Sequence, residues 1–279
     1  MIKITKKHSK MWESSHFYIV FRGVNLTQNR KMNFFEHPLC FFKKILYICA
    51  MLSESKDGRD NECKNMNVDK LIQEYFSNDV QPPIIEVFDD DNIVNVCHSI
   101  IDTLKNAPEI EICVLEAFNY CFYEILDNVL VHSEKTFGTT ITRYVPQKSL
   151  IQVLVADDGI GVHKSLTKNL LYNNLSEEDA LNKCIEDKVT DGKGMGFGLY
   201  STMRLVETGG HCLKIHSGNH ILTTDGVKTV VQECNFWQGT VIYLELKSDK
   251  EYDSDKVIGA DCQSEFEDYF LSETLENLW

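Results

Sequence analysis

A carboxylate, an amide and an imidazole recur at four-residue intervals in the segment FNYCFYEILDNVLVHS. Glu124, Asn128 and His132 would share one face of a helix, because residues four apart lie one above the other there. An amide oxygen is a suitable ligand for Mg2+, and a carboxylate can orient or deprotonate a water molecule. This face could therefore hold a hydrated cation and its phosphates. Taken alone, the pattern also fits an amphipathic helix with a polar outer surface.

Two glycine-containing segments follow this helix. In the first, IQVLVADDGIG, an apolar strand ends at Asp157, and Gly159 and Gly161 let the backbone turn sharply beside a flat ligand. A buried carboxylate at Asp157 could accept a hydrogen bond from an exocyclic amine. By itself, this segment also fits an ordinary turn.

The second segment, DGKGMGFGL, places glycine at alternate positions and runs directly into a predicted helix. Free backbone amides at a helix N-terminus bind anions through their oriented dipoles, and Lys193 could supply a counter-charge. The spacing is not that of a Walker loop, and no strand precedes it as a Rossmann fingerprint requires. The segment is therefore a candidate phosphate loop, with a flexible linker as the alternative. Its glycines are Gly192, Gly194, Gly196 and Gly198.

The elements that must position these residues indicate a layered α/β domain. Apolar residues recur at helical spacing from Ile93 to Leu104, and a longer helical pattern spans residues 109–133. Further helices are expected at 176–188 and 198–208. Short β-favouring runs separated by Gly, Pro, Asn and Asp predict the strands between them. These predicted strands span residues 139–145, 150–156, 211–216, 221–224 and 240–247.

The order and spacing of these motifs resemble those of the GHKL superfamily of ATPases. That superfamily comprises sensor histidine kinases, anti-sigma serine kinases, heat-shock-protein-90 chaperones and mismatch-repair proteins. EILDNVLVH is similar to its N box, DDGIG and GKGMGFGL to its two glycine boxes, and GTVIYLELK to its last strand. The short intervals between motifs resemble the two kinase branches most. The resemblance implies a two-layer α/β sandwich of the Bergerat type, with a mixed sheet and helices on one face.

The resemblance also implies a role for each matching residue. Glu124 would be the catalytic acid/base, Asn128 would ligate Mg2+, and Asp157 would receive the adenine amino group. Residues Val162–Lys193 would form a lid over ATP. The further cofactor-binding residues that it implies are His132, Gly159, Gly161, Lys193, Gly194, Gly196, Gly198, Leu199 and Thr240.

Composition and charge limit the other functions. The chain has 279 residues, of which 43% are hydrophobic, enough for one domain with appendages. Residues 1–50 hold nine Lys or Arg against two acidic residues, whereas the whole chain has a net charge of -14, so no nucleic-acid partner is expected. No apolar run approaches the ~20 residues of a membrane-spanning helix, and no secretory signal pattern is evident. We therefore expect a cytoplasmic protein with reduced cysteines and no zinc site.

We expect three parts in the chain. Residues 1–84 would be a basic segment and linker, 85–248 the ATP-binding domain, and 249–279 an acidic tail. The leading hypothesis is a Mg-ATP-binding regulatory protein of signal transduction that hydrolyses ATP or transfers a phosphoryl group to an unidentified protein partner. One alternative is a nucleotide-gated interaction module without turnover, and another is a pure adaptor recruited through its tails. A homodimer is one option for its assembly, and His98 is expected to be an ordinary helix histidine.

Overall fold

The computed structural model contains two compact units, Met1–Glu62 and Cys63–Trp279. The structure describes residues 3–7, 16–20, 66–76, 81–105, 110, 112–193, 196, 198–209, 212–250 and 257. In the first unit, β1 (Lys3–Lys7) pairs antiparallel with β2 (His16–Val20). None of the described helices is long and apolar enough to cross a membrane, and the cytoplasmic location stays a prediction.

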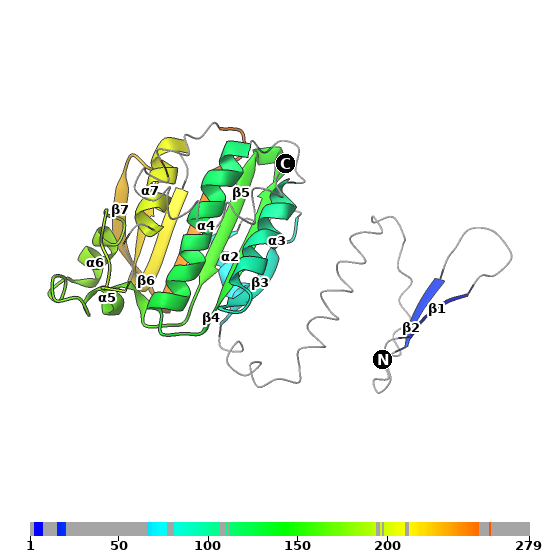
Figure 1. Ribbon diagram of the computed structural model, residues 1–279, viewed down its shortest axis with the longest axis horizontal. Helices are drawn as coiled ribbons and strands as arrows, with labels where there is room; N and C mark the ends of the chain where they lie inside the picture. Colours follow the sequence, from blue (N-terminus) through cyan, green and yellow to red (C-terminus); the bar gives the residue numbers. More distant parts are fainter. Residues whose placement is uncertain are drawn as a thin grey trace. The chain divides into compact units, whose positions relative to one another are not determined.

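The second unit is built on a five-stranded sheet with the strand order β3-β4-β5-β7-β6 (Figure 1). Every neighbouring pair in this sheet is antiparallel. The predicted α/β fold is confirmed, but the expected mixed sheet is wrong. A long connection with helices joins β5 to β6, but β7 lies between these two strands, so they do not pair with each other. The strands are β3 (Ile84–Asp89), β4 (Phe137–Val145), β5 (Leu150–Ala156), β6 (Cys212–Thr224) and β7 (Thr229–Lys247).

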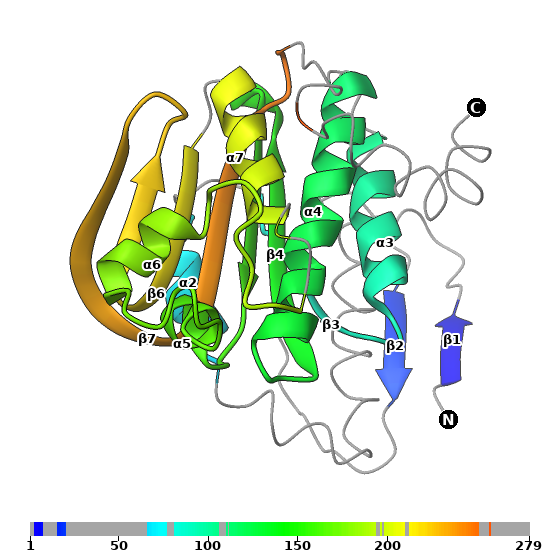
Figure 2. The ribbon, with the colours of Figure 1, turned by 60° about the vertical axis from the view of Figure 1, so that its left-hand side comes forward.

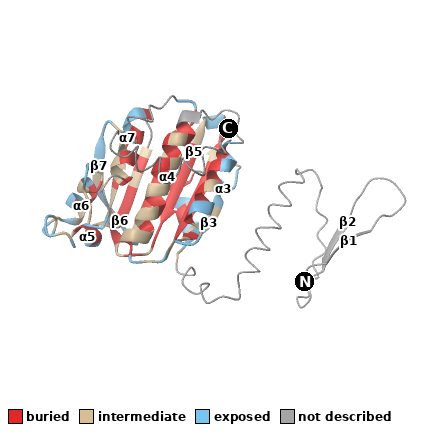
Figure 3. Cartoon of the chain, viewed as in Figure 1, coloured by how far each residue is buried: buried red, intermediate tan, exposed pale blue. Residues whose placement is uncertain are grey.

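Helices α3 (Ile93–Lys105), α4 (Ile112–His132) and α7 (Gly198–Gly209) cover one face of the sheet (Figures 1 and 2). Their apolar sides and the inward side chains of the central strands form the main core, which is buried in Figure 3. The shorter helices α5 (Gly161–Leu166) and α6 (Glu177–Lys183) belong to the connection between β5 and α7. Val257, in the expected acidic tail, is buried in the same core.

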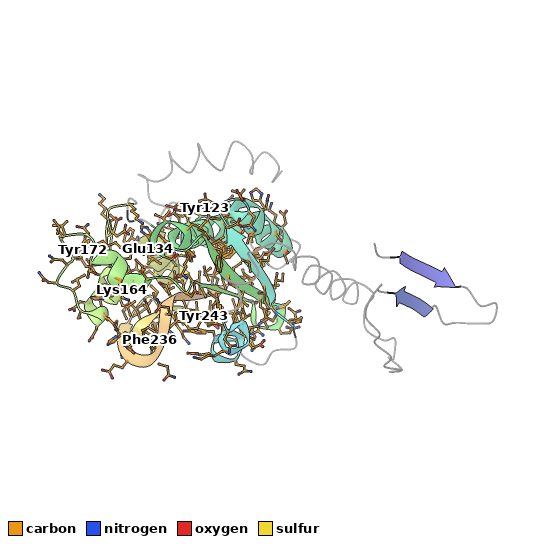
Figure 4. The ribbon with its side chains drawn as sticks, turned by 90° about the horizontal axis from the view of Figure 1, so that it is seen from below. Tyr123, Glu134, Lys164, Tyr172, Phe236 and Tyr243 are labelled. Carbon is orange, nitrogen blue, oxygen red and sulfur yellow. The ribbon has the colours of Figure 1, made fainter. Side chains whose placement is uncertain are left out.

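The opposite face of the sheet is covered by α2 (Val68–Tyr75), and Figure 4 shows this helix on the other side of the sheet from α3 and α4. The expectation that helices lie on one face only is therefore wrong. The central strands are buried on both faces, as the burial of every residue of β5 after Leu150 shows, and such a sheet needs cover on each side. The second core contains Leu71, Tyr75, Phe76, Ile141, Leu154, Ala156, Val241 and Tyr243.

Helix α2 begins with a side-chain cap. The Asn67 side-chain oxygen accepts a hydrogen bond from the backbone N–H of Lys70 at 2.9 Å, which satisfies one free donor of the first turn. At the other end, the Tyr75 hydroxyl lies 2.9 Å from Nδ1 of His216 on β6. The helix is thus attached to the sheet by a polar contact as well as by its apolar face.

The cover by α2 can be tested with Leu71→Ala. Leu71 is 1% exposed, so the substitution should leave a cavity and lower the free energy of unfolding by about 2–4 kcal/mol. Urea unfolding of the full chain measures this change. Gln73→Ala, at an exposed position of the same helix, is the matched control and should change stability by less than about 0.5 kcal/mol. Equal effects of the two variants would show that α2 does not pack on the sheet.

Candidate functional site

A cavity of about 430 Å3 brings together most of the residues that the sequence singled out. Cavities of roughly 300–1,000 Å3 are typical of small-molecule sites. Ten of the twelve candidate residues line it, whereas Gly159 lies in the adjoining turn and Gly194 lies outside the described residues. The ten are Glu124, Asn128, His132, Asp157, Gly161, Lys193, Gly196, Gly198, Leu199 and Thr240.

Helix α4 supplies the polar row of the cavity because its two sides have different neighbours. Apolar residues such as Phe118 and Phe122 are fully buried in the main core. Glu124, Asn128 and His132 line the cavity instead, as their four-residue spacing predicts. The predicted helix is thus confirmed, and its polar row forms part of the cavity wall.

The N-terminus of α7 approaches this row very closely. A Cβ atom at Gly198 would lie 2.9 Å from both Oε2 of Glu124 and Nδ2 of Asn128, so a larger residue would displace these two side chains. Nδ2 of Asn128 is buried and has no hydrogen-bond partner among the described residues. A buried polar group without a partner is costly, and a ligand in the cavity would supply the missing contact.

The opposite end of the cavity is formed by Asp157, which follows β5 and is 3% exposed. Its backbone N–H donates to the carbonyl oxygen of Thr240 at 2.9 Å, and its Oδ1 accepts from the backbone N–H of Gly159 at 2.8 Å. Burial raises the pKa of Asp157 to about 7, against the lowering effect of backbone hydrogen bonds from Gly159 and Thr240 to the carboxyl group. The carboxyl group is therefore a buried, oriented acceptor whose charge changes near neutral pH.

The turn after Asp157 requires glycine at position 159. A Cβ atom there would lie 2.2 Å from the carbonyl oxygen of Ser133, at the end of α4. The backbone N–H of Ile160 donates to that same oxygen at 3.0 Å. The turn that carries Asp157 is consequently fixed to the helix that carries Glu124 and Asn128.

The comparisons with known proteins agree with this geometry. Residues 114–250 match the family model of the histidine kinase-, DNA gyrase B-, and HSP90-like ATPases. Residues 114–250 belong to this ATPase family. The matched span runs from α4 to the end of β7 and contains the whole cavity, and it supports ATP as the ligand. No curated protein matches the chain.

Three residues of the ATPase domain that hold the Asp157 turn were missed by sequence reasoning. Nε1–H of Trp237 donates to the carbonyl oxygen of Asp157 at 3.1 Å, and Nε2 of Gln238 donates to that of Gly159 at 2.5 Å. The hydroxyl of Ser217 donates to the carbonyl oxygen of Gly239 and accepts from the backbone N–H of Val162. Their side chains carry no spacing signal; the one clue in the sequence was that Trp237 and Gln238 directly precede the Gly-Thr turn.

The connection between α6 and α7, part of the segment expected to form a lid, contacts the end of α4. Oδ1 of Asp191 lies 3.0 Å from Nδ1 of His132, and the Lys193 ammonium donates to the carbonyl oxygen of Val131 at 3.0 Å. Burial would raise the pKa of Asp191, but hydrogen bonds from His132, the Lys193 backbone and Ser165 bring it below its ordinary value. The two basic residues expected near phosphate thus lie at the cavity, and both are engaged with protein atoms here.

The raised pKa of Asp157 predicts that Asp157→Asn stabilises the protein without ligand. Folding raises this pKa from 3.8 to about 7, so the unfolded chain loses the proton first and stability falls as the pH rises between these values. Asparagine cannot ionise but can still accept from Gly159. Thermal unfolding at pH 8 should show a gain of about 1–4 kcal/mol that disappears near pH 4.

Asp187→Asn is the control, because it removes an exposed carboxylate from the connection between α6 and α7. It should give no comparable gain in stability at pH 8. A lower stability of Asp157→Asn at pH 8 would show that the ionised carboxylate is well accommodated, contrary to the burial of its charge.

Proposed function

We propose that residues 85–248 form a domain that binds Mg-ATP and transfers its terminal phosphoryl group to water or to a protein partner. The observation that carries this proposal is the meeting of Glu124 and Asn128 with the N-terminus of α7, inside the cavity that ends at Asp157. The family match supports the nucleotide but leaves the reaction open. The β3 and α3 elements, which precede the matched span, share its sheet and core and support a domain that begins before residue 114.

Asp157 is the proposed adenine contact. Its buried carboxyl accepts from the Gly159 backbone and has further lone pairs for the exocyclic amine of adenine. Trp237 and Gln238 fix the position of the turn through its two carbonyl oxygens. Gly161 and Thr240 line the cavity beside it, which supports their proposed place around the base.

The proposed phosphate end lies between α4 and α7. The first N–H groups of α7 have no partners within the helix, and the helix dipole favours an anion there. Gly196, Gly198 and Leu199 line this end of the cavity, while the role proposed for Gly194 concerns a residue outside the described ones. His132 and Lys193 also line the cavity and add basic groups to it.

The charges around the cavity support a requirement for Mg2+. The carboxyl groups that line it belong to Glu124, Asp127, Asp157 and Asp191, against the basic side chains of His132 and Lys193. A triphosphate would add further negative charge. Asn128 is the proposed protein ligand of the ion, which when bound would neutralise charge on the phosphate oxygens. Because Mg2+ keeps several waters and binds mainly to phosphates, one amide oxygen is a sufficient protein contribution.

Glu124 is the proposed acid/base residue. It lies one helical turn before Asn128, and both side chains meet Gly198. From this position its carboxylate can accept a proton from the attacking water or from a partner's hydroxyl or imidazole group. The same geometry serves hydrolysis and phosphoryl transfer, and the acceptor distinguishes the two.

The proposed biological role is regulation of a protein partner by the nucleotide state of the lid, in the manner of the histidine kinase and anti-sigma kinase branches. The alternative is a nucleotide-gated interaction module without turnover, which would use the same cavity and would not need the Glu124 carboxylate. A protein partner and a homodimer both stay predictions.

Glu124→Gln separates these alternatives. In an enzyme, the substitution removes the proton acceptor but keeps the side-chain shape, so phosphate release should fall by roughly 100-fold or more. Binding of Mg-ATP, measured by titration calorimetry, should change by less than about threefold. Phosphate release from full-length protein, assayed with and without candidate partner proteins, is the measurement.

Glu116→Gln, earlier on α4 and away from the residues that line the cavity, is the matched control and should keep full activity. If wild-type protein binds Mg-ATP but releases no phosphate and labels no partner, the module without turnover is the correct description.

A further inference from the structure

The carboxylate of Asp191 is held at the cavity by three donors from three parts of the chain. Oδ1 lies 3.0 Å from Nδ1 of His132 on α4 and accepts from the backbone N–H of Lys193 at 3.0 Å. Oδ2 accepts from the hydroxyl of Ser165 on α5 at 3.0 Å. Its side chain is 1% exposed, so water does not replace these donors. An ionised carboxylate accepts only, which places the hydrogen of His132 on Nδ1.

This donor set is also suited to a phosphoryl oxygen. Carboxylates and phosphates both take hydrogen bonds from imidazole, hydroxyl and backbone N–H groups. His132, Ser165, Asp191 and Lys193 all line the cavity. His132 lies on α4 between Asn128, the proposed ligand of the phosphate-bound Mg2+, and Ser133, whose carbonyl oxygen holds the Asp157 turn, so the donors lie between the proposed phosphate and adenine ends.

We propose that Asp191 is a built-in occupant of a phosphate subsite formed by His132, Ser165 and the backbone N–H of Lys193, and that a nucleotide phosphate displaces it. The inference rests on the proposed function and adds to it the subsite, the residue Ser165 and the competing carboxylate. Without nucleotide, the carboxylate satisfies these three donors, of which the Ser165 hydroxyl belongs to a buried residue. With nucleotide, it would stand beside a like charge, which makes its departure favourable.

The surroundings of Asp191 are compatible with such an exchange. Asp191 lies between α6 and α7, outside any described helix or strand, and Gly192 beside it has no neighbouring atoms around a Cβ position. Lys193 is attached through its ammonium group to Val131, next to His132, so its positive charge stays near the donors when the carboxylate leaves. Displacement of Asp191 would also break its contact with His132 on α4, which links phosphate binding to the position of this connection.

Asp191→Asn tests the competition, because asparagine keeps the size of the side chain and removes its charge. Titration calorimetry of the full chain with ATP and with adenosine, at fixed Mg2+, is the measurement. The dissociation constant for ATP should fall about tenfold, whereas that for adenosine, which lacks phosphate, should change by less than about twofold. Asp187→Asn, exposed on the same connection, removes an equal charge and should leave both constants within about twofold of wild type.

Asp191→Ser provides a second variant, since its short side chain cannot reach the three donors, and it should tighten ATP binding in the same way. Adding Ser165→Ala to Asp191→Asn should weaken ATP binding by roughly fivefold and leave adenosine binding unchanged. Unchanged or weaker ATP binding by both Asp191 variants, with adenosine binding intact, would overturn the competition while leaving the nucleotide site in place. If wild type bound neither adenosine nor ATP, the proposed function would fail and this inference with it.

Discussion

The close approach of α7 to α4 at Gly198 is the contact on which the rest of the site depends. It places the N-terminus of α7 against Glu124 and Asn128, since a Cβ atom at residue 198 would lie only 2.9 Å from a polar atom of each side chain. Helix α4 can hold this position because its other side is buried against the sheet. A buried amide without a partner among the described residues and a helix N-terminus, whose first N–H groups have no partners within the helix, therefore face the same space, and a ligand there could contact both.

The sheet determines where the second half of the site lies. Ala156 pairs with Val241, so the end of β5 lies beside the interior of β7, and the backbone N–H of Asp157 donates to the carbonyl oxygen of Thr240. Beneath these strands, the buried Arg143 donates to Gln152, which in turn donates to Tyr243 and Glu245. This network connects β4, β5 and β7 and satisfies their buried polar groups, which stabilises the register that positions Asp157. Cover by α2 excludes water from it.

Much of the site could be predicted from the sequence because it is carried by local patterns. The four-residue spacing of Glu124, Asn128 and His132 needs only an α-helix, and β5 begins and ends where its apolar run does. The contacts of Trp237, Gln238 and Asp191 could not be predicted, since they join residues far apart in sequence and no spacing rule governs them. The sheet topology could not be predicted for the same reason, because the position of β7 between β5 and β6 depends on pairing between residues far apart in the sequence.

Element boundaries failed where one strand contains a local irregularity. Residues 211–216 and 221–224 were predicted as separate strands, but β6 continues through a bulge at Ser217, Gly218 and His220. β7 begins at Thr229 rather than 240 because it pairs with this extended strand, and the predicted helix 176–188 ends at Lys183. β3 and α2 were not predicted at all. Both are short, and packing against the sheet stabilises them more than any local pattern does.

The central claim is that Asp157 accepts a hydrogen bond from adenine in a cavity whose other end binds the phosphates. The most direct measurement is equilibrium binding of ATP and GTP to the full chain at pH 8 with Mg2+, where most of the Asp157 carboxyl is ionised. The amine of adenine donates to a carboxylate, whereas the guanine oxygen at the same position would be repelled by it. ATP binding at least about tenfold tighter than GTP binding is the predicted result. Equal affinities, or no binding of either nucleotide, would contradict the account.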